Sequence, residues 1–161
     1  MTAPSLGSLA RLRPGYFAGA YTFWGVENRE APLRYVPGSA LLGDGHANVE
    51  LKTSDAAANP YLALAVLLAA GAAGVADGLA PPPALQSDPG AWSGEERAAR
   101  GVHPLPSTPA EQEAALTGNP RIAGVLGDAL LGAFLAVRRS DAAAAQGRPM
   151  DEVLAALRFR Y

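Results

Sequence analysis

Five charged side chains in the first third of the chain are suited to binding an anionic ligand. Arg29 and Arg34 lie on one predicted strand segment, Glu50 and Lys52 lie on the next, and Arg11 precedes a Pro-Gly turn. Guanidinium groups form paired hydrogen bonds to carboxylate and phosphate oxygens. A carboxylate is a hard oxygen ligand for Mg²⁺, which usually binds one or two carboxylates together with substrate phosphates. If the segments pair so that Arg34 and Glu50 share a face, the group can hold phosphate, metal and substrate together.

The same pattern also fits an ordinary exposed pair of strands. Such strands commonly have one charged face, and Arg–Glu pairs across neighbouring strands are frequent. The charge pattern alone therefore leaves a ligand site and a solvated surface both open.

Other motifs do not predict a site. His46 and His103 are far apart in the sequence and the chain has no Cys, so a zinc site is not expected. The Gly-rich segment 37–45 lacks the glycine spacing and the Gly-Lys-Ser/Thr ending of a phosphate-binding loop. We interpret both features as loops.

Composition limits the classes of partner. A length of 161 residues indicates one domain or part of one. The net charge of −2 gives no electrostatic reason to expect nucleic acid or an anionic membrane as a partner. The first residues lack a signal-peptide pattern, and the absence of Cys excludes disulfides, so we expect a cytoplasmic protein. The apolar segment Tyr61–Ala76 is shorter than the roughly 20 residues of a membrane span, and we expect a buried helix instead.

Two segments are predicted to form the strands that carry the charges. The first is the second half of Glu27–Val36 and the second is Ala47–Thr53, and the Gly-rich loop between them predicts an antiparallel hairpin. Alternation places Val49 and Leu51 on the face opposite Glu50. Pro32 is expected to confine the first strand to a sheet edge or to require a bulge.

The rest of the chain is predicted to be mainly helical. Asn59-Pro60 is an N-cap followed by a favourable first helical residue, and Gly78 is suited to end that helix. Thr108 and Glu111 have capping-box spacing. The helices and turns expected after the strands are Asn59–Asp77, a short turn at Gly94–Arg100 within the long connection 80–106, a helix from Thr108, Arg121–Ala145, and a last one around Val153–Leu157. The predicted fold class is α+β, with a small antiparallel sheet or hairpin followed by a mainly α-helical C-terminal half.

Two stretches resemble the C-terminal part of the glutamine synthetase catalytic domain. They are "RLRPGYFAGAYTFWGVENREAPLRYVPG" and "NVELKTSDAAANPYLALAVLLAAGAAGVADGL". The matching features are the Arg-Leu-x-Pro-Gly turn, Asn-Arg followed by a second Arg, and Asp-x-x-x-Asn-Pro-Tyr-Leu. Residues 10–80 match well and residues 100–161 match loosely. The nearest likeness is to the branch that contains γ-glutamyl-amine ligases.

The resemblance implies an activity and a role for each charged residue. In that family ATP phosphorylates the γ-carboxylate of glutamate, and ammonia or an amine then displaces phosphate. Arg29 matches the Arg that neutralises the transferring phosphoryl group, and Arg34 matches one that holds ATP phosphates. Arg11 and Lys52 stand at glutamate-binding positions. Glu50 matches a ligand of the divalent metal, Mg²⁺ or Mn²⁺.

Two departures from the family pattern bear on the substrates. Phe17 stands where glutamine synthetases proper have the Glu that binds and deprotonates ammonium, so the amine acceptor stays open. Lys52 replaces an Arg, which keeps the positive charge but loses bidentate geometry.

The resemblance implies that residues 1–161 form the C-terminal portion of such a catalytic domain. The family's N-terminal β-grasp domain and the first half of its catalytic domain have no counterpart here. The chain is therefore expected to be a ligase piece that acts with a complementing N-terminal half, or in a homo-oligomer. An inactive remnant and a phosphate- or carboxylate-binding module are the alternatives. We expect no turnover by the chain alone.

Overall fold

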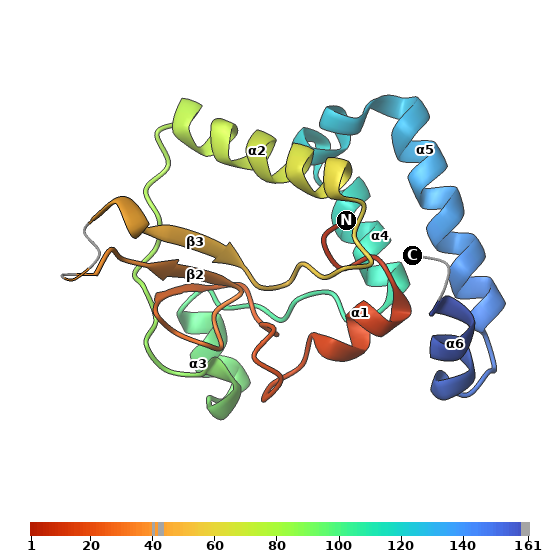
Figure 1. Ribbon diagram of the computed structural model, residues 1–161, viewed down its shortest axis with the longest axis horizontal. Coiled ribbons are helices and arrows are strands. Elements are labelled where there is room, and N and C mark those ends of the chain that lie inside the picture. The colour runs from red at the N-terminus through yellow and green to blue at the C-terminus, as the bar shows by residue number, and fades with distance from the viewer. Residues whose placement is uncertain (40, 42–43, 159–161) are drawn as a thin grey trace. The chain divides into compact units, whose positions relative to one another are not determined.

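The chain forms two compact units. A computed structural model describes residues 1–39, 41 and 44–158. The sheet unit comprises Arg11–Ser54 and Ala80–Leu105, and the helical unit comprises Met1–Ala10, Asp55–Leu79 and the chain from Pro106 onward. Figure 1 labels the α-helices of both units and the strands β2 and β3.

The sheet unit contains a three-stranded sheet in the order β1-β2-β3, with β1 at Trp24–Val26, β2 at Leu33–Val36 and β3 at Asn48–Leu51. β2 and β3 are antiparallel, as predicted (Figure 1). β1 runs parallel to β2, which was not predicted. The connection between β2 and β3 includes the 3₁₀ turn η1 (Asp44–His46), and residues 40, 42 and 43 of the Gly-rich loop lie outside the described part of the chain.

The prediction that Pro32 confines its strand to an edge or a bulge is wrong. β2 is the central strand of the sheet, and it begins at Leu33, one residue after the proline. The proline therefore needs no amide hydrogen there, and its carbonyl accepts a hydrogen bond of 2.8 Å from the Lys52 main-chain N–H.

The two faces of the sheet differ in chemistry, as the alternation predicts. On one face Leu33 pairs with Leu51 and Tyr35 with Val49, and these side chains line an apolar pocket of about 650 Å³. On the opposite face Arg34 pairs with Glu50. Because neighbouring residues of a strand point to opposite faces, the apolar pairing and the charged pairing fix one another.

The long connection after Leu79 packs onto the sheet unit. It contains η2 (Pro89–Ala91) and α3 (Gly94–Ala99), which confirms the predicted short helical turn. The Leu85 main-chain N–H donates to the Trp24 carbonyl over 2.9 Å. A small core joins the connection to the sheet unit, and its members are Phe23, Ala31, Val102, Tyr21, Leu85 and Trp92.

The helical unit contains α1 (Leu6–Arg11, whose last residue belongs to the sheet unit), α2 (Pro60–Ala76), α4 (Pro109–Thr117), α5 (Pro120–Ala145) and α6 (Met150–Leu157). The predicted caps are present: the Asn59 side chain accepts from the N–H groups of Tyr61 and Leu62, and Thr108 and Glu111 form the capping box. The termini of these helices therefore followed from local signals.

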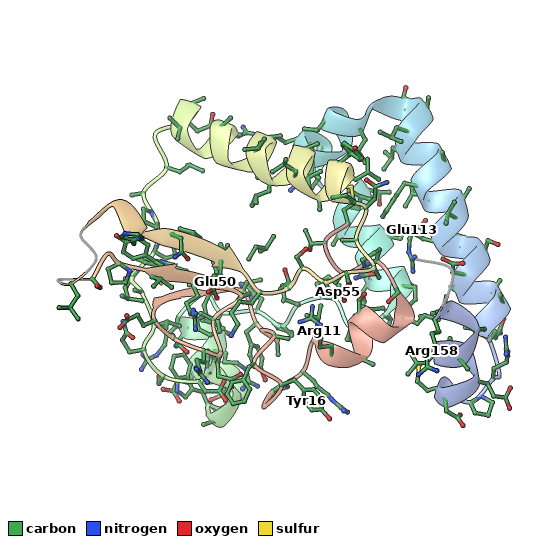
Figure 2. The ribbon with its side chains drawn as sticks, in the orientation of Figure 1. Arg11, Tyr16, Glu50, Asp55, Glu113 and Arg158 are labelled. Atoms are coloured by element: carbon green, nitrogen blue, oxygen red, sulfur yellow. The ribbon has the colours of Figure 1, made fainter. Side chains whose placement is uncertain are left out.

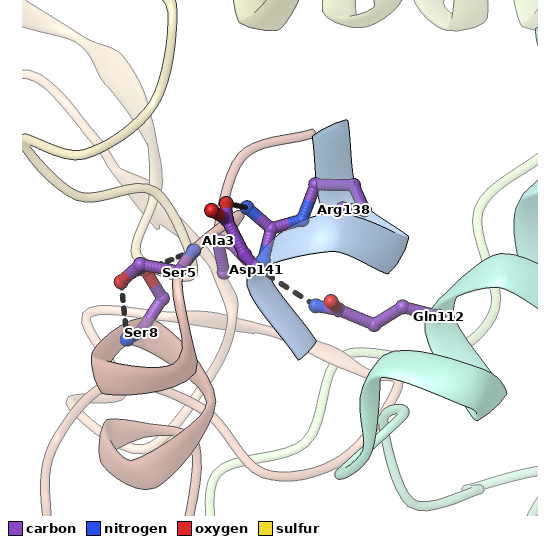
Figure 3. Close-up of polar contacts among 6 residues, drawn as sticks. All are labelled: Ala3, Ser5, Ser8, Gln112, Arg138 and Asp141. Atoms are coloured by element: carbon purple, nitrogen blue, oxygen red, sulfur yellow. Dashed lines mark hydrogen bonds and ion pairs between the residues drawn. The ribbon is translucent and has the colours of Figure 1, made fainter. Parts of the chain in front are cut away.

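Helix α1 was not predicted. Ser5 and Ser8 exchange hydrogen bonds, with the Ser8 N–H donating to Ser5 Oγ over 2.9 Å and the Ser5 N–H to Ser8 Oγ over 3.1 Å (Figure 3). Nearby, Gln112 Nε2 donates to the Ala3 carbonyl over 3.0 Å (Figure 3). The Ser-x-x-Ser spacing before an apolar residue was the sequence signal for this helix.

Helix α5 is long and apolar enough to cross a membrane by length and composition alone. Its backbone, however, breaks at Gly127, where φ is 68° and ψ is 165°. Such a break leaves main-chain polar groups without helical partners, which a hydrocarbon environment does not satisfy. On the same helix, Arg139 Nε donates to Glu113 Oε2 of α4 over 3.0 Å. Both features are unlike those of a helix surrounded by lipid.

Helix α2 is less buried than its composition predicts. Among its residues only Val66 is buried, while Tyr61, Leu64 and Leu68 are exposed. Within the described chain the expectation of a buried helix is therefore wrong. Contiguous exposed apolar side chains of this kind commonly mark a surface that another element covers.

We predict that Asn59→Ala lowers the free energy of unfolding by about 1 kcal/mol, because it removes the oxygen that accepts from two otherwise unpaired N–H groups of α2. The measurement is urea denaturation followed by far-ultraviolet circular dichroism. Asn48→Ala, at an exposed strand position, is the matched control and should change the free energy little. Equal effects of the two substitutions would contradict the capping role.

Candidate active site

The pairing of β2 with β3 brings Arg34 and Glu50 together. Arg34 Nη2 lies 2.8 Å from Glu50 Oε1, and the two side chains are 22% and 43% exposed. Figure 2 shows Glu50 on β3, and the register places Arg34 directly opposite on β2. The predicted shared face is thus present in the structure.

Arg34 has a donor that the ion pair does not use. Its Nε is buried and has no hydrogen-bond partner among the described residues. A buried unpaired N–H costs free energy. The other donors of the guanidinium are of the kind that form charge-assisted hydrogen bonds to phosphate or carboxylate oxygens.

Lys52 follows β3 and joins the charged group. Its ammonium donates to the Arg29 main-chain carbonyl. Partial burial lowers the pKa of Lys52, and the positive charge of Arg34 lowers that pKa further, while Glu30 and Glu50 act in the opposite direction. These charges are therefore close enough to influence one another.

Arg29 is exposed, and its loop is held by Asn28, to which the sequence analysis gave no role beyond its place in the Asn-Arg motif. Asn28 Nδ2 donates to the Leu85 carbonyl over 2.9 Å, and Asn28 Oδ1 accepts from the Glu30 N–H over 3.0 Å. Within the described part of the chain, no hydrogen bond or ion pair occupies the Arg29 guanidinium. The position of Asn28 next to Arg29 was the feature of the sequence that could have indicated this role.

Arg11 lies at the end of β3, with its donors directed at the main chain (Figure 2). Its Nη1 donates to the Lys52 carbonyl over 3.2 Å, and its Nη2 donates to the carbonyls of Thr53 and Ser54 over 3.0 and 3.2 Å. The structure therefore brings Arg11 next to Lys52. These hydrogen bonds hold the main chain in place where it leaves β3.

Phe17 has an unusual backbone. It is 57% exposed and its φ is 53°, in the left-handed region that residues other than Gly rarely adopt. Beside it, the Arg13 guanidinium stacks on the Tyr16 ring at 4.0 Å from the centroid. Strained conformations of this kind concentrate at functional sites.

The charged side chains of this group are better suited to bind an anion than to hold a metal ion without other ligands. Among the described residues no three His, Cys, Asp or Glu side chains gather at one point. Glu50 is the carboxylate on the charged face of the hairpin, and it already pairs with Arg34. It can supply one ligand to a divalent ion whose other ligands are phosphate oxygens and water.

Comparison with known proteins decides the family. The sequence matches the family described as glutamine synthetase, catalytic domain, over residues 1–155. The chain belongs to this family. Its predicted α+β fold and the predicted resemblance are both confirmed.

Members of the glutamine synthetase family resemble the chain over nearly its whole length. It is 45% identical over 161 residues to the gamma-glutamylpolyamine synthetase GlnA3 of Streptomyces coelicolor, covering 100% of the chain and 34% of that protein. It is 36% identical over 141 residues to the glutamine synthetase of Thermus thermophilus, covering 88% of the chain and 31% of that protein. The chain thus spans about a third of the length of these curated relatives.

Solved structures of the family show the same fold. A crystal structure of a glutamine synthase homologue superposes with a TM-score of 0.78 and 29% identity, covering 99% of this chain and 34% of that one. A GmaS–ADP complex superposes with a TM-score of 0.71 and 27% identity, covering 92% of this chain and 33% of that one.

We predict opposite shifts in the pKa of Lys52 for two substitutions. Arg34→Gln removes a neighbouring positive charge and raises the pKa, whereas Glu50→Gln removes a negative charge and lowers it. Lys52 is the only lysine of the chain, so a carbon-13 NMR titration of the side chain, without added divalent metal, follows a single lysine signal. Shifts of the same sign in both variants would show that these charges do not converge.

Proposed function

We propose that the chain provides part of the active site of an ATP-dependent ligase of glutamine synthetase type. This ligase joins ammonia or an amine to the γ-carboxylate of glutamate through γ-glutamyl phosphate. The observation that carries the proposal is the cross-strand contact of Arg34 with Glu50, in a group with Lys52 and Arg29. The family of the chain supports the reaction class.

The cations have distinct roles in this proposal. Arg34 holds the phosphates of ATP with the donors that face away from Glu50. Arg29, whose guanidinium is exposed, opposes the charge on the phosphoryl group as its bond to ADP breaks and its bond to the glutamate γ-carboxylate oxygen forms. Positioning and fixed positive charge supply most of the catalysis of phosphoryl transfer. The amine nitrogen then attacks the acyl carbon, and phosphate leaves.

A divalent cation, Mg²⁺ or Mn²⁺, would supply further charge neutralisation between ATP and glutamate, with Glu50 as its ligand from this chain. Its position on the charged face of the hairpin supports that role.

Arg11 and Lys52 are the residues proposed to bind glutamate. The Lys52 ammonium has further N–H donors besides the one directed at the Arg29 carbonyl, and these can bind a carboxylate of the ligand. For Arg11, contact with glutamate requires donors beyond those that bind the carbonyls after β3.

The acceptor that we propose is an amine with a carbon chain. Phe17 has no charge with which to bind or deprotonate ammonium, and its exposed ring offers apolar surface instead. The name of the relative with 45% identity specifies a polyamine as the group joined to glutamate, which supports the same class of acceptor.

A second candidate is a binding module for phosphate or carboxylate groups, without turnover. The presence of a single carboxylate opposite Arg34, and of no metal-ligand cluster among the described residues, favours this interpretation for the chain taken alone. For the ligase, we propose a cytoplasmic assembly in which a complementing N-terminal half or a homo-oligomer supplies the remaining metal ligands. Nucleic acid and membrane are not proposed as partners.

We predict that Arg34→Ala weakens the binding of ATP–Mg²⁺ by roughly 10- to 100-fold, since it removes charge-assisted hydrogen bonds to phosphate. Isothermal titration calorimetry on the chain measures the dissociation constant. Arg148→Ala removes the same charge from a site in the helical unit, where Arg148 is 3.7 Å from Glu152, and should leave the constant unchanged. Equal weakening by both variants would indicate nonspecific charge attraction and would contradict a phosphate site at Arg34.

We further predict that the chain alone releases no phosphate from ATP in the presence of glutamate, Mg²⁺ and a polyamine, because one carboxylate does not hold the metal ions that the reaction needs. A coupled phosphate-release assay tests this. Steady turnover that depends on glutamate would contradict the expectation and favour a self-sufficient enzyme.

A further inference from the structure

Lys52 touches both ends of the short segment that presents Arg29. Its main-chain N–H donates to the Pro32 carbonyl over 2.8 Å, and its ammonium donates to the Arg29 carbonyl. Between these two points Ala31 is fully buried, with 0% exposure, in the small core of the sheet unit. The segment 29–32 is therefore fixed at its start, in its middle and at its end.

The base of Lys52 is itself held. The Arg11 guanidinium donates to the Lys52 carbonyl and to the carbonyls of Thr53 and Ser54. Main-chain rotation at this position would break those hydrogen bonds together with the last bond of the β2–β3 ladder. The main chain at Lys52 is thus held in place, and the Lys52 ammonium reaches the Arg29 carbonyl from this fixed position.

In this arrangement Arg29 is positioned through its main chain and not through contacts of its own side chain. The Arg29 guanidinium is exposed and has no hydrogen-bond or ion-pair partner among the described residues. A long cationic side chain without a partner is positioned only as well as its main chain. The tether from Lys52 reaches that main chain directly, at the carbonyl of the same residue.

We propose that Lys52 is a positioning residue, which orders the Arg29 segment through the carbonyl of Arg29. This role goes beyond charge: a side chain of similar length that donates a hydrogen bond should order the segment even when neutral. The effect of this positioning on catalysis rests on the proposed function. The ordering of the Arg29 segment by Lys52 does not. It is compatible with a carboxylate contact by the remaining N–H donors of the ammonium.

The first test compares Lys52→Met with Lys52→Gln, which match each other in charge and approximate length but differ in the ability to donate. Hydrogen exchange measured by NMR reports on the N–H groups of Glu30 and Ala31, which bond to Asn28. We expect exchange of these two amides to be about tenfold faster in Lys52→Met, which corresponds to the loss of one hydrogen bond. Lys52→Gln should stay within about threefold of the unsubstituted chain. Arg148→Met, a loss of cation in the helical unit, should change neither amide.

Unchanged exchange in Lys52→Met would overturn the proposal, and so would equal acceleration in Lys52→Met and Lys52→Gln. Thermal melts of both variants identify global destabilisation. If acceleration extends equally to amides throughout the sheet unit, the effect is not local and the proposal is likewise rejected.

The second test separates the positioning role from the proposed function. We expect Lys52→Met to bind ATP–Mg²⁺ several-fold more weakly than Lys52→Gln, and this difference to vanish when Arg29→Ala is added, because Lys52 then has no guanidinium to place. A difference that persists in the Arg29→Ala background would contradict action through Arg29. If the unsubstituted chain does not bind ATP–Mg²⁺, the proposed function fails, while the exchange rates still decide whether Lys52 orders the segment.

Discussion

The antiparallel pairing of β2 with β3 is the constraint on which the candidate site depends. It sets Arg34 opposite Glu50 at 2.8 Å and, one residue beyond the strand, brings Lys52 back to the segment that begins at Arg29. A shift of one residue in this register would send these charges to the other face of the sheet. The chemistry of the site is thus decided by main-chain hydrogen bonds.

The charged face does not supply the energy that holds this register. A partly exposed ion pair such as Arg34–Glu50 contributes on the order of 0–1 kcal/mol. On the opposite face Leu33 pairs with Leu51 and Tyr35 with Val49, but Leu33, Tyr35 and Val49 are 40%, 37% and 64% exposed, so this face buries only part of its apolar surface. The register therefore depends chiefly on the main-chain ladder between β2 and β3, which sets Arg34 opposite Glu50 and brings Lys52 to the Arg29 carbonyl.

Local sequence signals predicted most of the elements because each depends on a few neighbouring residues. Asn59-Pro60, and Thr108 with Glu111, determine helix starts by their own hydrogen bonds, and alternation around Arg34 and Glu50 determines the faces of the hairpin. The parallel strand β1 was missed because parallel strands usually need a long crossover connection, whereas only residues 27–32 join β1 to β2. The break at Gly127 was missed because an isolated glycine is compatible with an apolar helix until packing requires a positive φ.

The site was predictable in its residues but not in all their contacts. Family resemblance assigned anion-binding roles to Arg11 and Lys52, whereas the structure directs donors of both to main-chain carbonyls. Carbonyl acceptors are present at every residue, so nothing in the sequence indicates which of them a side chain will reach. For the same reason the contacts of Asn28, which fix the Arg29 loop through main-chain groups, were not predicted, although the Asn-Arg motif was noted.

The most direct measurement is an experimentally determined structure of the chain with ATP–Mg²⁺ bound. We predict phosphate oxygens within hydrogen-bonding distance of the Arg34 guanidinium, on the face of the hairpin that carries Glu50, with the Arg29 guanidinium turned toward the same phosphates. Nucleotide bound on the apolar face, or Arg29 and Arg34 directed away from a common ligand, would contradict it.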